Sequence, residues 1–271
     1  MLSDEQIVFY KENGYVLVPG MFTPDESAAF RVECHELADR LAAIRDIDAT
    51  WASVQSADGA QPTKVLACHD VQFQSAALSG LIVDERLTGA AASIIGPNVQ
   101  LHHTKMFIKP PEKGFPFPLH QDVPYFPHEK DSLIAAIIHF DDAPLERGCV
   151  HVVSDSHLRG RLPHETVDGF HLDLTEYPIE SATPLPAKAG DVLFFSYLTI
   201  HGSGVNTSDE ARTTLLVQMR DPADPPSIRV HESRGQGMML RGIDPSCATT
   251  EPLSDDPNDN PVLLVGAMSR S

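Results

Sequence analysis

From Val99 onward, short apolar runs alternate with Pro, Gly and Asp residues. Apolar runs of this length, bounded by turn-forming residues, are typical of β-strands, and many in succession are typical of an all-β sandwich or barrel. We therefore expect a mainly β fold in which residues 99–220 form a double-stranded β-helix, or jelly roll, with a site between its two sheets.

The first 98 residues carry helix signals and are expected to support this core from outside. Ser3 with Gln6 resembles a capping box, and a Pro just inside a helix start costs no hydrogen bond. The expected elements are a helix from Ser3 to Gly14, a strand Tyr15–Val18, a helix that begins at Pro24 and a helix Ser79–Ile95. No repeat is visible, so residues 1–271 are expected to form a single domain.

Two further segments are expected to lie outside the jelly-roll core. Residues 155–188 are rich in His, Pro and charge and are interpreted as a lid-like insertion. Residues 221–271 carry Pro, Asp and Gly clusters with little periodicity, which leaves open whether this tail is ordered over the domain.

Charge and cysteine usage limit the classes of partner. A formal net charge of -18 and a pI near 5.0 disfavour binding to nucleic acid or to an anionic membrane. No apolar run approaches the roughly 18 residues of a membrane span, and the acidic N-terminus does not resemble a secretory signal. The four scattered cysteines are interpreted as reduced thiols, so we expect a cytoplasmic protein whose oligomeric state the sequence leaves open.

The pattern His-x-Asp occurs twice, at His120/Asp122 and at His171/Asp173. Two imidazoles and one carboxylate form the facial triad that holds Fe(II) and leaves other coordination positions open. Inside a β-barrel, a distal His must follow several strands later. The roughly 80 residues between Asp122 and His201 accommodate four or five strands, whereas the segment after Asp173 is too short and is interpreted as a polar loop.

Arg212 follows His201 by eleven positions and opens a run rich in β-branched residues, which predicts a strand over residues 212–219. A guanidinium matches a carboxylate bidentately, as would be needed to hold the far end of 2-oxoglutarate. We expect this strand to lie antiparallel to the strand that carries His201, with Ser203 near the same carboxylate.

Three blocks in the same order resemble the phytanoyl-CoA dioxygenase family of Fe(II)/2-oxoglutarate-dependent oxygenases, over about residues 64–219. They are Lys109-Pro110-Pro111 with Pro118-Leu119-His120-Gln121-Asp122 and Tyr125-Phe126-Pro127; Gly148-Cys149-Val150 with Ser154-Asp155-Ser156-His157; and Gly190-Asp191-Val192 with His201-Gly202-Ser203-Gly204 and Arg212. The resemblance implies a cupin-like enzyme that uses Fe(II), 2-oxoglutarate and dioxygen on a small-molecule substrate.

Carried over residue by residue, the resemblance implies His120, Asp122 and His201 as catalytic iron ligands. Arg212, Ser203 and Lys105 would bind 2-oxoglutarate. The residues expected to contact the substrate are Lys64, Gln121, Tyr125, Ile138 and His157.

The same resemblance bears on the reaction. Halogenating relatives replace the carboxylate at the position of Asp122 with Ala or Gly, so its presence favours oxygen chemistry. Ile138 stands where relatives commonly carry Trp, and Asp155 must build a tight turn made with Gly in relatives. Hydroxylation of a secondary-metabolite scaffold or a lipid-like molecule is the first expectation. Epimerisation, desaturation or cyclisation at the same iron, and a non-catalytic cupin-like binding module, are the alternatives.

Overall fold

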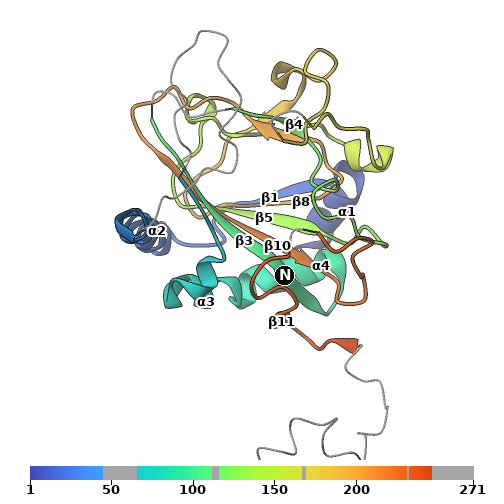
Figure 1. Cartoon of the computed structure of the whole chain (residues 1–271), viewed down its shortest axis with the longest axis horizontal. Coiled ribbons are helices and arrows are strands. Elements are labelled where there is room, and N and C mark those ends of the chain that lie inside the picture. Colours follow the sequence, from blue (N-terminus) through green and yellow to red (C-terminus); the bar gives the residue numbers. More distant parts are fainter. Residues whose placement is uncertain (45–65, 112–115, 167–168, 231, 246–271) are drawn as a thin grey trace, which may run out of the picture.

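Two antiparallel sheets that face each other form the body of the protein (Figure 1). The computed structural model describes residues 1–44, 66–111, 116–166, 169–230 and 232–245. The larger sheet has the strand order β1-β8-β5-β10-β3-β11, with β2 also pairing with β3, and the smaller sheet has the order β4-β9-β6-β7. This is the mainly β, double-sheet fold predicted from the alternating apolar runs.

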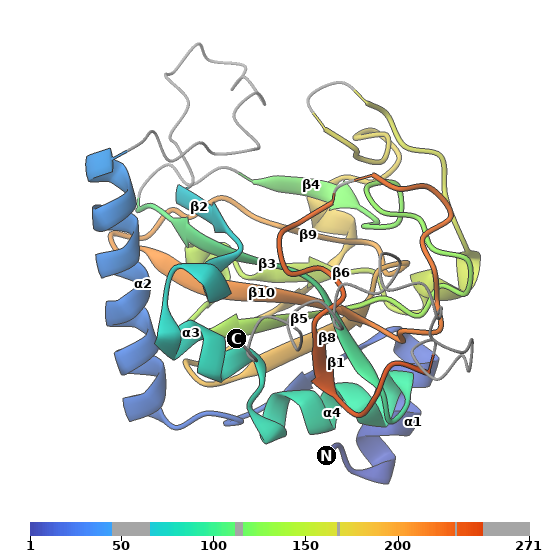
Figure 2. The same cartoon turned by 60° about the horizontal axis from the view of Figure 1, so that its bottom comes forward.

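The helices α2, α3 and α4 lie on the side of the larger sheet that faces away from β4 (Figures 1 and 2). The helices are α1 (Asp4–Asn13), α2 (Pro24–Ile44), α3 (Ala76–Ile82) and α4 (Glu85–Ile95). The strands are β1 (Tyr15–Val18), β2 (Leu66–His69), β3 (Val99–Lys109), β4 (Phe117–His120), β5 (Ile134–His139), β6 (Val150–Val152), β7 (Thr183–Leu185), β8 (Val192–Ser196), β9 (His201–Ser203), β10 (Arg212–Arg220) and β11 (Met239–Arg241).

Most of the local predictions for the first 44 residues are confirmed. Ser3 and Gln6 form a reciprocal capping box, α1 ends at Gly14 in a left-handed conformation, and β1 covers residues 15–18. The helix α2 begins at Pro24. The prediction of one helix over residues 79–95 is wrong, because the helix is interrupted between α3 and α4. Asp84 caps the start of α4, where its carboxylate accepts the backbone N–H of Arg86.

The strands that carry His201 and Arg212 do not pair, which corrects the predicted hairpin. The strand β9 pairs with β4 and β6 in the smaller sheet, whereas β10 pairs with β3 and β5 in the larger one. His201 and Arg212 therefore belong to opposite sheets. The chain crosses from one sheet to the other between residues 204 and 211, so the two side chains approach a common space from different sides.

The segments predicted to lie outside the core are partly built into it. The strand β7 falls within residues 155–188 and pairs with β6, so the predicted insertion is wrong for its last part. The role of the preceding residues as a lid remains a prediction. In the tail, β11 pairs with the edge of β3, and the tail beyond residue 245 lies outside the described residues.

The two faces of β10 have different partners, as the period of two in a strand requires. Leu215, Val217 and Met219 are fully buried in a core cluster that the larger sheet forms with α2, α3 and α4. The intervening positions face the smaller sheet.

None of the described helices combines the length and the apolar character needed to cross a membrane.

Replacing Leu215 with Ala should destabilise the fold. Leu215 is 0% exposed, so the change removes buried apolar contacts and leaves a cavity, which lowers the free energy of unfolding by about 2–5 kcal/mol. Urea denaturation measures this. Leu158→Ala is the matched control, because Leu158 is 70% exposed and its removal should change stability by less than about 0.5 kcal/mol. Equal losses in the two variants would contradict the assignment of the core.

Candidate metal centre

Pairing between β4 and β9 brings two imidazoles close together, with ring centroids 4.3 Å apart. His120, the last residue of β4, lies directly opposite His201, the first residue of β9. Asp122 follows two residues after His120, and the three possible ligand atoms lie within 4.8 Å of one another. The Nε2 atoms of His120 and His201 lie 3.6 Å and 3.7 Å from the same carboxylate oxygen, Oδ1 of Asp122.

Backbone carbonyls orient both imidazoles. Nδ1 of His120 lies 2.8 Å from the Pro118 carbonyl, and Nδ1 of His201 lies 2.9 Å from the Thr199 carbonyl. A carbonyl oxygen can only accept, so each Nδ1 carries the hydrogen and each Nε2 keeps its lone pair. Both lone pairs are therefore available beside Asp122, in the tautomer that a metal ligand needs.

The charge states of the cluster suit a divalent cation. Burial acts to raise the pKa of Asp122, but the imidazoles of His201 and His120 and a hydrogen bond from Gln218 together lower it to about 2. Burial, with His120 nearby, lowers the pKa of His201 to about 4. Asp122 is thus an anion and His201 a neutral imidazole at neutral pH. Two imidazoles and one carboxylate fit Fe(II), with positions left open for other ligands.

Gln218 connects the triad to the larger sheet. Its side-chain amide donates a 2.7 Å hydrogen bond to Oδ2 of Asp122. The other carboxylate oxygen, Oδ1, is the one nearest the two imidazoles. Gln218 is fully buried on β10. The contact holds the carboxylate in one orientation and leaves Oδ1 directed toward the two imidazoles.

A cavity of about 240 Å³ extends from the triad between the two sheets. Both sheets and the loop after β4 contribute to its wall, which is largely aromatic and apolar with cationic groups along one side. The lining residues beside the triad are His69, His103, Lys105, Phe107, Phe117, Tyr125, Phe126, Ile137, Val150, Gly169, Phe195, Gly202, Ser203, Arg212, Thr214, Leu216 and Gln218.

Arg212 places a buried guanidinium in this cavity. The side chain is 5% exposed, and its Nη1 donates to the Gly148 carbonyl. Nε is buried and makes no hydrogen bond within the described residues. Gly148 has a φ of +66°, and a Cβ there would meet the Gly204 carbonyl oxygen at 2.5 Å, so this close approach requires Gly.

Several other predicted site residues also line the cavity. Ser203 does so two residues after His201, and its Oγ accepts a 2.8 Å hydrogen bond from Lys109 Nζ. Lys105 lines the wall, and burial lowers its pKa to about 8 against the opposing effect of Asp122. Tyr125 lies at the same wall, where its hydroxyl accepts the backbone N–H of Phe170.

Three residues predicted to contact the substrate lie elsewhere. Ile138 is buried in the core cluster on the opposite face of β5, and its neighbour Ile137 lines the cavity instead. The amide of Gln121 donates to the carbonyls of Gly160 and Leu198, so it ties loops together. His157 contacts the carbonyl of Lys11 and thereby braces α1. Lys64 lies outside the described residues.

The second His-x-Asp is part of a loop, as predicted. His171 Nδ1 contacts the Leu172 carbonyl, and Asp173 accepts the backbone N–H groups of Thr175 and Glu176. Among the described residues, His120, Asp122 and His201 form the group with metal-binding spacing. Asp155 adopts a φ of 61°, which confirms that it makes the tight turn expected of it.

Sequence reasoning missed Gln218, Thr214 and Lys109. A usable signal existed for the first two: the strand over residues 212–219 was predicted, and every second residue after Arg212 must share its face. Lys109 was part of a recognised block but was given no role. His69 was missed because its strand, β2, was not predicted. His103 was given no role, although it lies two residues before Lys105 and therefore shares its face of β3.

The double-sheet fold with a buried His-Asp-His triad defines a non-haem metal-dependent oxygenase. The model of the phytanoyl-CoA dioxygenase family matches residues 10–214, and the chain belongs to that family.

Known proteins resemble the chain over most of its length. The peroxisomal phytanoyl-CoA dioxygenase of Rattus norvegicus is 27% identical over 230 residues, which cover 79% of this chain and 67% of that protein. The ectoine dioxygenase of Bordetella parapertussis is 26% identical over 250 residues, or 83% and 78% of the two chains. Among solved structures, the α-ketoglutarate-dependent carbocyclase SnoK from nogalamycin biosynthesis has a TM-score of 0.70 and 28% identity, covering 88% of this chain and 93% of that chain.

Family membership and the triad together establish the class of enzyme. The protein is an Fe(II)- and 2-oxoglutarate-dependent dioxygenase. The residues present fit that cofactor pair, because a neutral-imidazole and carboxylate set stands beside a buried guanidinium in one cavity.

Replacing Gln218 with Leu should weaken Fe(II) binding by about 10-fold or more, because Asp122 loses the donor that orients it. Anaerobic titration with Fe(II) measures the dissociation constant. Gln100→Leu provides a matched control, since Gln100 is also buried on the larger sheet but donates toward Met239 and Asp244, away from the triad. Wild-type affinity in the Gln218 variant would show that Asp122 needs no such support.

Proposed function

We propose that this enzyme oxidises a small organic molecule, most simply by hydroxylation, with His120, Asp122 and His201 as its iron ligands. Arg212 and Ser203 then hold the distal carboxylate of 2-oxoglutarate. The observation that carries the proposal is the buried Arg212 guanidinium, which faces the same cavity as the triad with Nε left without a hydrogen bond among the described residues. A carboxylate would satisfy it bidentately.

When bound, iron and 2-oxoglutarate would activate dioxygen: one oxygen atom would enter the succinate formed as 2-oxoglutarate loses CO2, and the other would be available to oxidise the substrate. The protein fixes the ligand geometry through the carbonyls behind His120 and His201 and through Gln218. Phe107, Phe117 and Phe195 contribute an apolar wall that keeps water from the reacting atoms.

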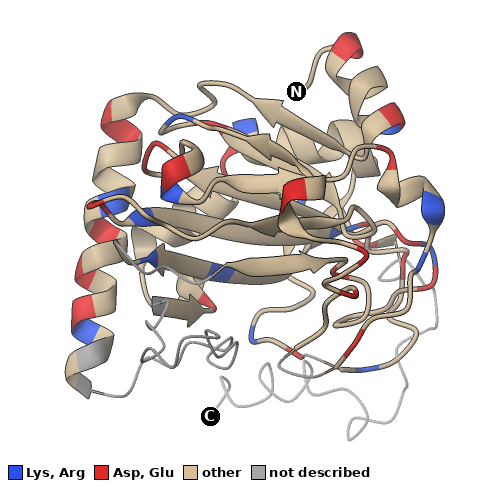
Figure 3. Ribbon diagram, turned by 90° about the horizontal axis from the view of Figure 1, so that it is seen from above, with Lys and Arg blue, Asp and Glu red and all other residues tan. Residues whose placement is uncertain are grey.

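The walls of the cavity support a substrate that is an uncharged or weakly charged organic scaffold, of the secondary-metabolite or lipid-like kind. Tyr125 and Phe126 offer flat apolar surfaces near the triad. Acidic and basic residues are interspersed along α2 (Figure 3), and the net charge of -18 makes a polyanionic partner unfavourable. The residue of β5 that lines this proposed pocket is Ile137, and not Ile138 as the sequence predicted.

Cyclisation at the same iron is the second candidate reaction. It is favoured by the likeness to SnoK, which is named a carbocyclase and is 28% identical over most of both chains. The ligand set does not distinguish the two outcomes, since both begin with removal of hydrogen from the substrate.

The proposal includes a reducing, cytoplasmic setting. Cys34, Cys68 and Cys149 are buried free thiols in the described part of the chain, and disulfides are rare where thiols are kept reduced. Cys247, the fourth cysteine of the sequence, lies outside the described residues.

Anaerobic addition of Fe(II) and 2-oxoglutarate should produce a metal-to-ligand charge-transfer band, and exposure to oxygen should then yield succinate. His120→Ala and His201→Ala should each abolish the band, because each removes one of three ligands. Absence of the band in the wild type would favour a non-catalytic binding module. A band that persists in either variant would show that the ligands are different residues.

Arg212→Ala should weaken 2-oxoglutarate binding by about 100-fold or more while iron affinity stays near that of the wild type. The change removes a buried cation that faces the cavity but does not contact the triad. Titration of the charge-transfer band with 2-oxoglutarate gives the first affinity, and anaerobic titration with Fe(II) gives the second. Arg229→Ala is the control, because Arg229 lies at the surface with its side chain 85% exposed. Unchanged affinity for 2-oxoglutarate would assign this role to another residue.

A further inference from the structure

Lys109 is a lysine buried completely behind the cavity. It is the last residue of β3, lies directly opposite Arg212 on β10, and is 0% exposed. Its Nζ donates a 2.8 Å hydrogen bond to Ser203 Oγ and a 2.6 Å hydrogen bond to the Gly204 carbonyl. Lys109 thus joins the larger sheet to β9, two residues beyond the His201 ligand.

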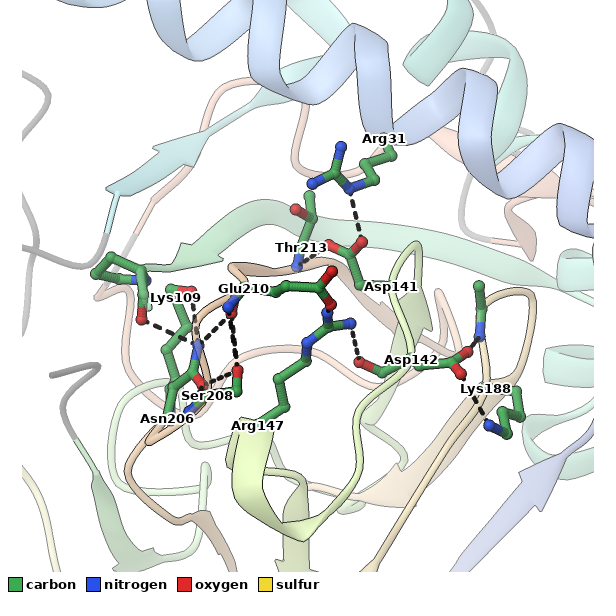
Figure 4. Close-up of polar contacts among 12 residues, drawn as sticks. Arg31, Lys109, Asp141, Asp142, Arg147, Lys188, Asn206, Ser208, Glu210 and Thr213 are labelled. Atoms are coloured by element: carbon green, nitrogen blue, oxygen red, sulfur yellow. Dashed lines mark hydrogen bonds and ion pairs between the residues drawn. The ribbon is translucent and has the colours of Figure 1, made fainter. Parts of the chain in front are cut away.

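The backbone around Lys109 is held as firmly as its side chain. The Asn206 amide donates to the carbonyls of Lys109, Pro110 and Glu210, so it binds the end of β3 to the connection between β9 and β10 (Figure 4). Glu210 in turn pairs with Arg147. The position of Nζ beside Ser203 is therefore imposed from both strands and does not depend on a flexible surface side chain.

Lys109 and Arg212 are two neighbouring cations, and neither forms an ion pair with a carboxylate in the described part of the chain. The polar partners of their side chains are the hydroxyl of Ser203 and the carbonyls of Gly204 and Gly148. Burial, together with Arg212, lowers the pKa of Lys109 well below its usual value, and burial lowers the pKa of Arg212 to about 10. Both shifts mean that burial disfavours the charged forms, and a carboxylate bound beside the two side chains would favour them again.

Ser203 links Lys109 to the cavity, because it lines the cavity wall whereas Lys109 lies behind it. An ammonium group has donors and no acceptor, so in the bond from Lys109 the serine oxygen must accept. The hydroxyl hydrogen of Ser203 is then left to donate to a ligand. A carboxylate at Arg212 would be in place to accept it.

We propose that Lys109 is a positioning residue for the distal carboxylate of 2-oxoglutarate, which acts by fixing Ser203 as a hydrogen-bond donor and by adding a second positive charge beside Arg212. This inference rests on the proposed role of Arg212 and Ser203. It predicts that the pocket selects keto acids that end in a second carboxylate, and that Lys109 contributes to this selection without touching the iron or the substrate.

The test compares two keto acids in the charge-transfer titration: 2-oxoglutarate, and 2-oxobutyrate, which lacks the distal carboxylate. Lys109→Met keeps the side chain unbranched and only one atom shorter, and removes its donors and charge. It should weaken 2-oxoglutarate binding by about 10-fold or more, because Ser203 loses the hydrogen bond from the charged Lys109 side chain that fixes its hydroxyl. Binding of 2-oxobutyrate and of Fe(II) should change by less than about twofold.

A combined variant shows whether Lys109 acts through Ser203. If it does, the two effects overlap. The double variant with Lys109→Met and Ser203→Ala should then lose less affinity for 2-oxoglutarate than the product of the two single fold losses. Lys188→Met is the matched control, because its side chain is 78% exposed, pairs with Asp142 at the surface and should leave both affinities unchanged. Lys109→Leu, which also lacks a donor and a charge, provides the same comparison if the Met variant aggregates.

The outcomes separate this inference from the proposed function. No charge-transfer band with wild-type protein would overturn the proposed function itself. A normal wild-type band, with 2-oxoglutarate affinity unchanged in Lys109→Met, would overturn the role of Lys109 alone. An equal loss for both keto acids would show that Lys109 only supports the fold, and would also overturn the inference.

Discussion

The hydrogen bond from Gln218 to Asp122 joins the two sheets at the metal centre. Gln218 belongs to β10 of the larger sheet, and Asp122 follows β4 of the smaller one. All three ligands come from the smaller sheet and the loop next to it, while the cationic groups of the cavity come from the larger sheet. The geometry of the site therefore depends on how the two sheets are placed against each other. The hydrogen bond from Gln218 to Asp122 fixes this placement at the point where the carboxylate must be oriented.

Buried charge is the second constraint on the molecule. Lys109 lies behind the cavity end that Arg212 lines, and both side chains are removed from water. An unpaired buried charge lowers stability, and strongly perturbed ionisable groups cluster at functional sites. The backbone contacts of Asn206 and the close approach at Gly148 hold this end rigid, so a carboxylate would meet donors already in place.

Sequence reasoning worked best for features that depend on residue types and their spacing along the chain. The capping box at Ser3 and the strand at residues 15–18 follow from local rules, and both are present. The choice of His120 and Asp122 over His171 and Asp173 came from counting the strands that a barrel needs, and these two side chains do lie together with His201. Placement of Ile138 failed because adjacent strand residues point to opposite faces, and an error of one position exchanges core for cavity.

The sequence by itself determined the family, the double-sheet class of fold and a candidate set of metal ligands, since these depend on residue identity, order and spacing. Only the tertiary structure decided that His201 and Arg212 belong to opposite sheets and that Ile137 faces the cavity. It also decided that Lys109 reaches Ser203. These facts depend on strand pairing and on the crossing of the chain between sheets, which bring together residues whose separation along the chain carries no signal of contact.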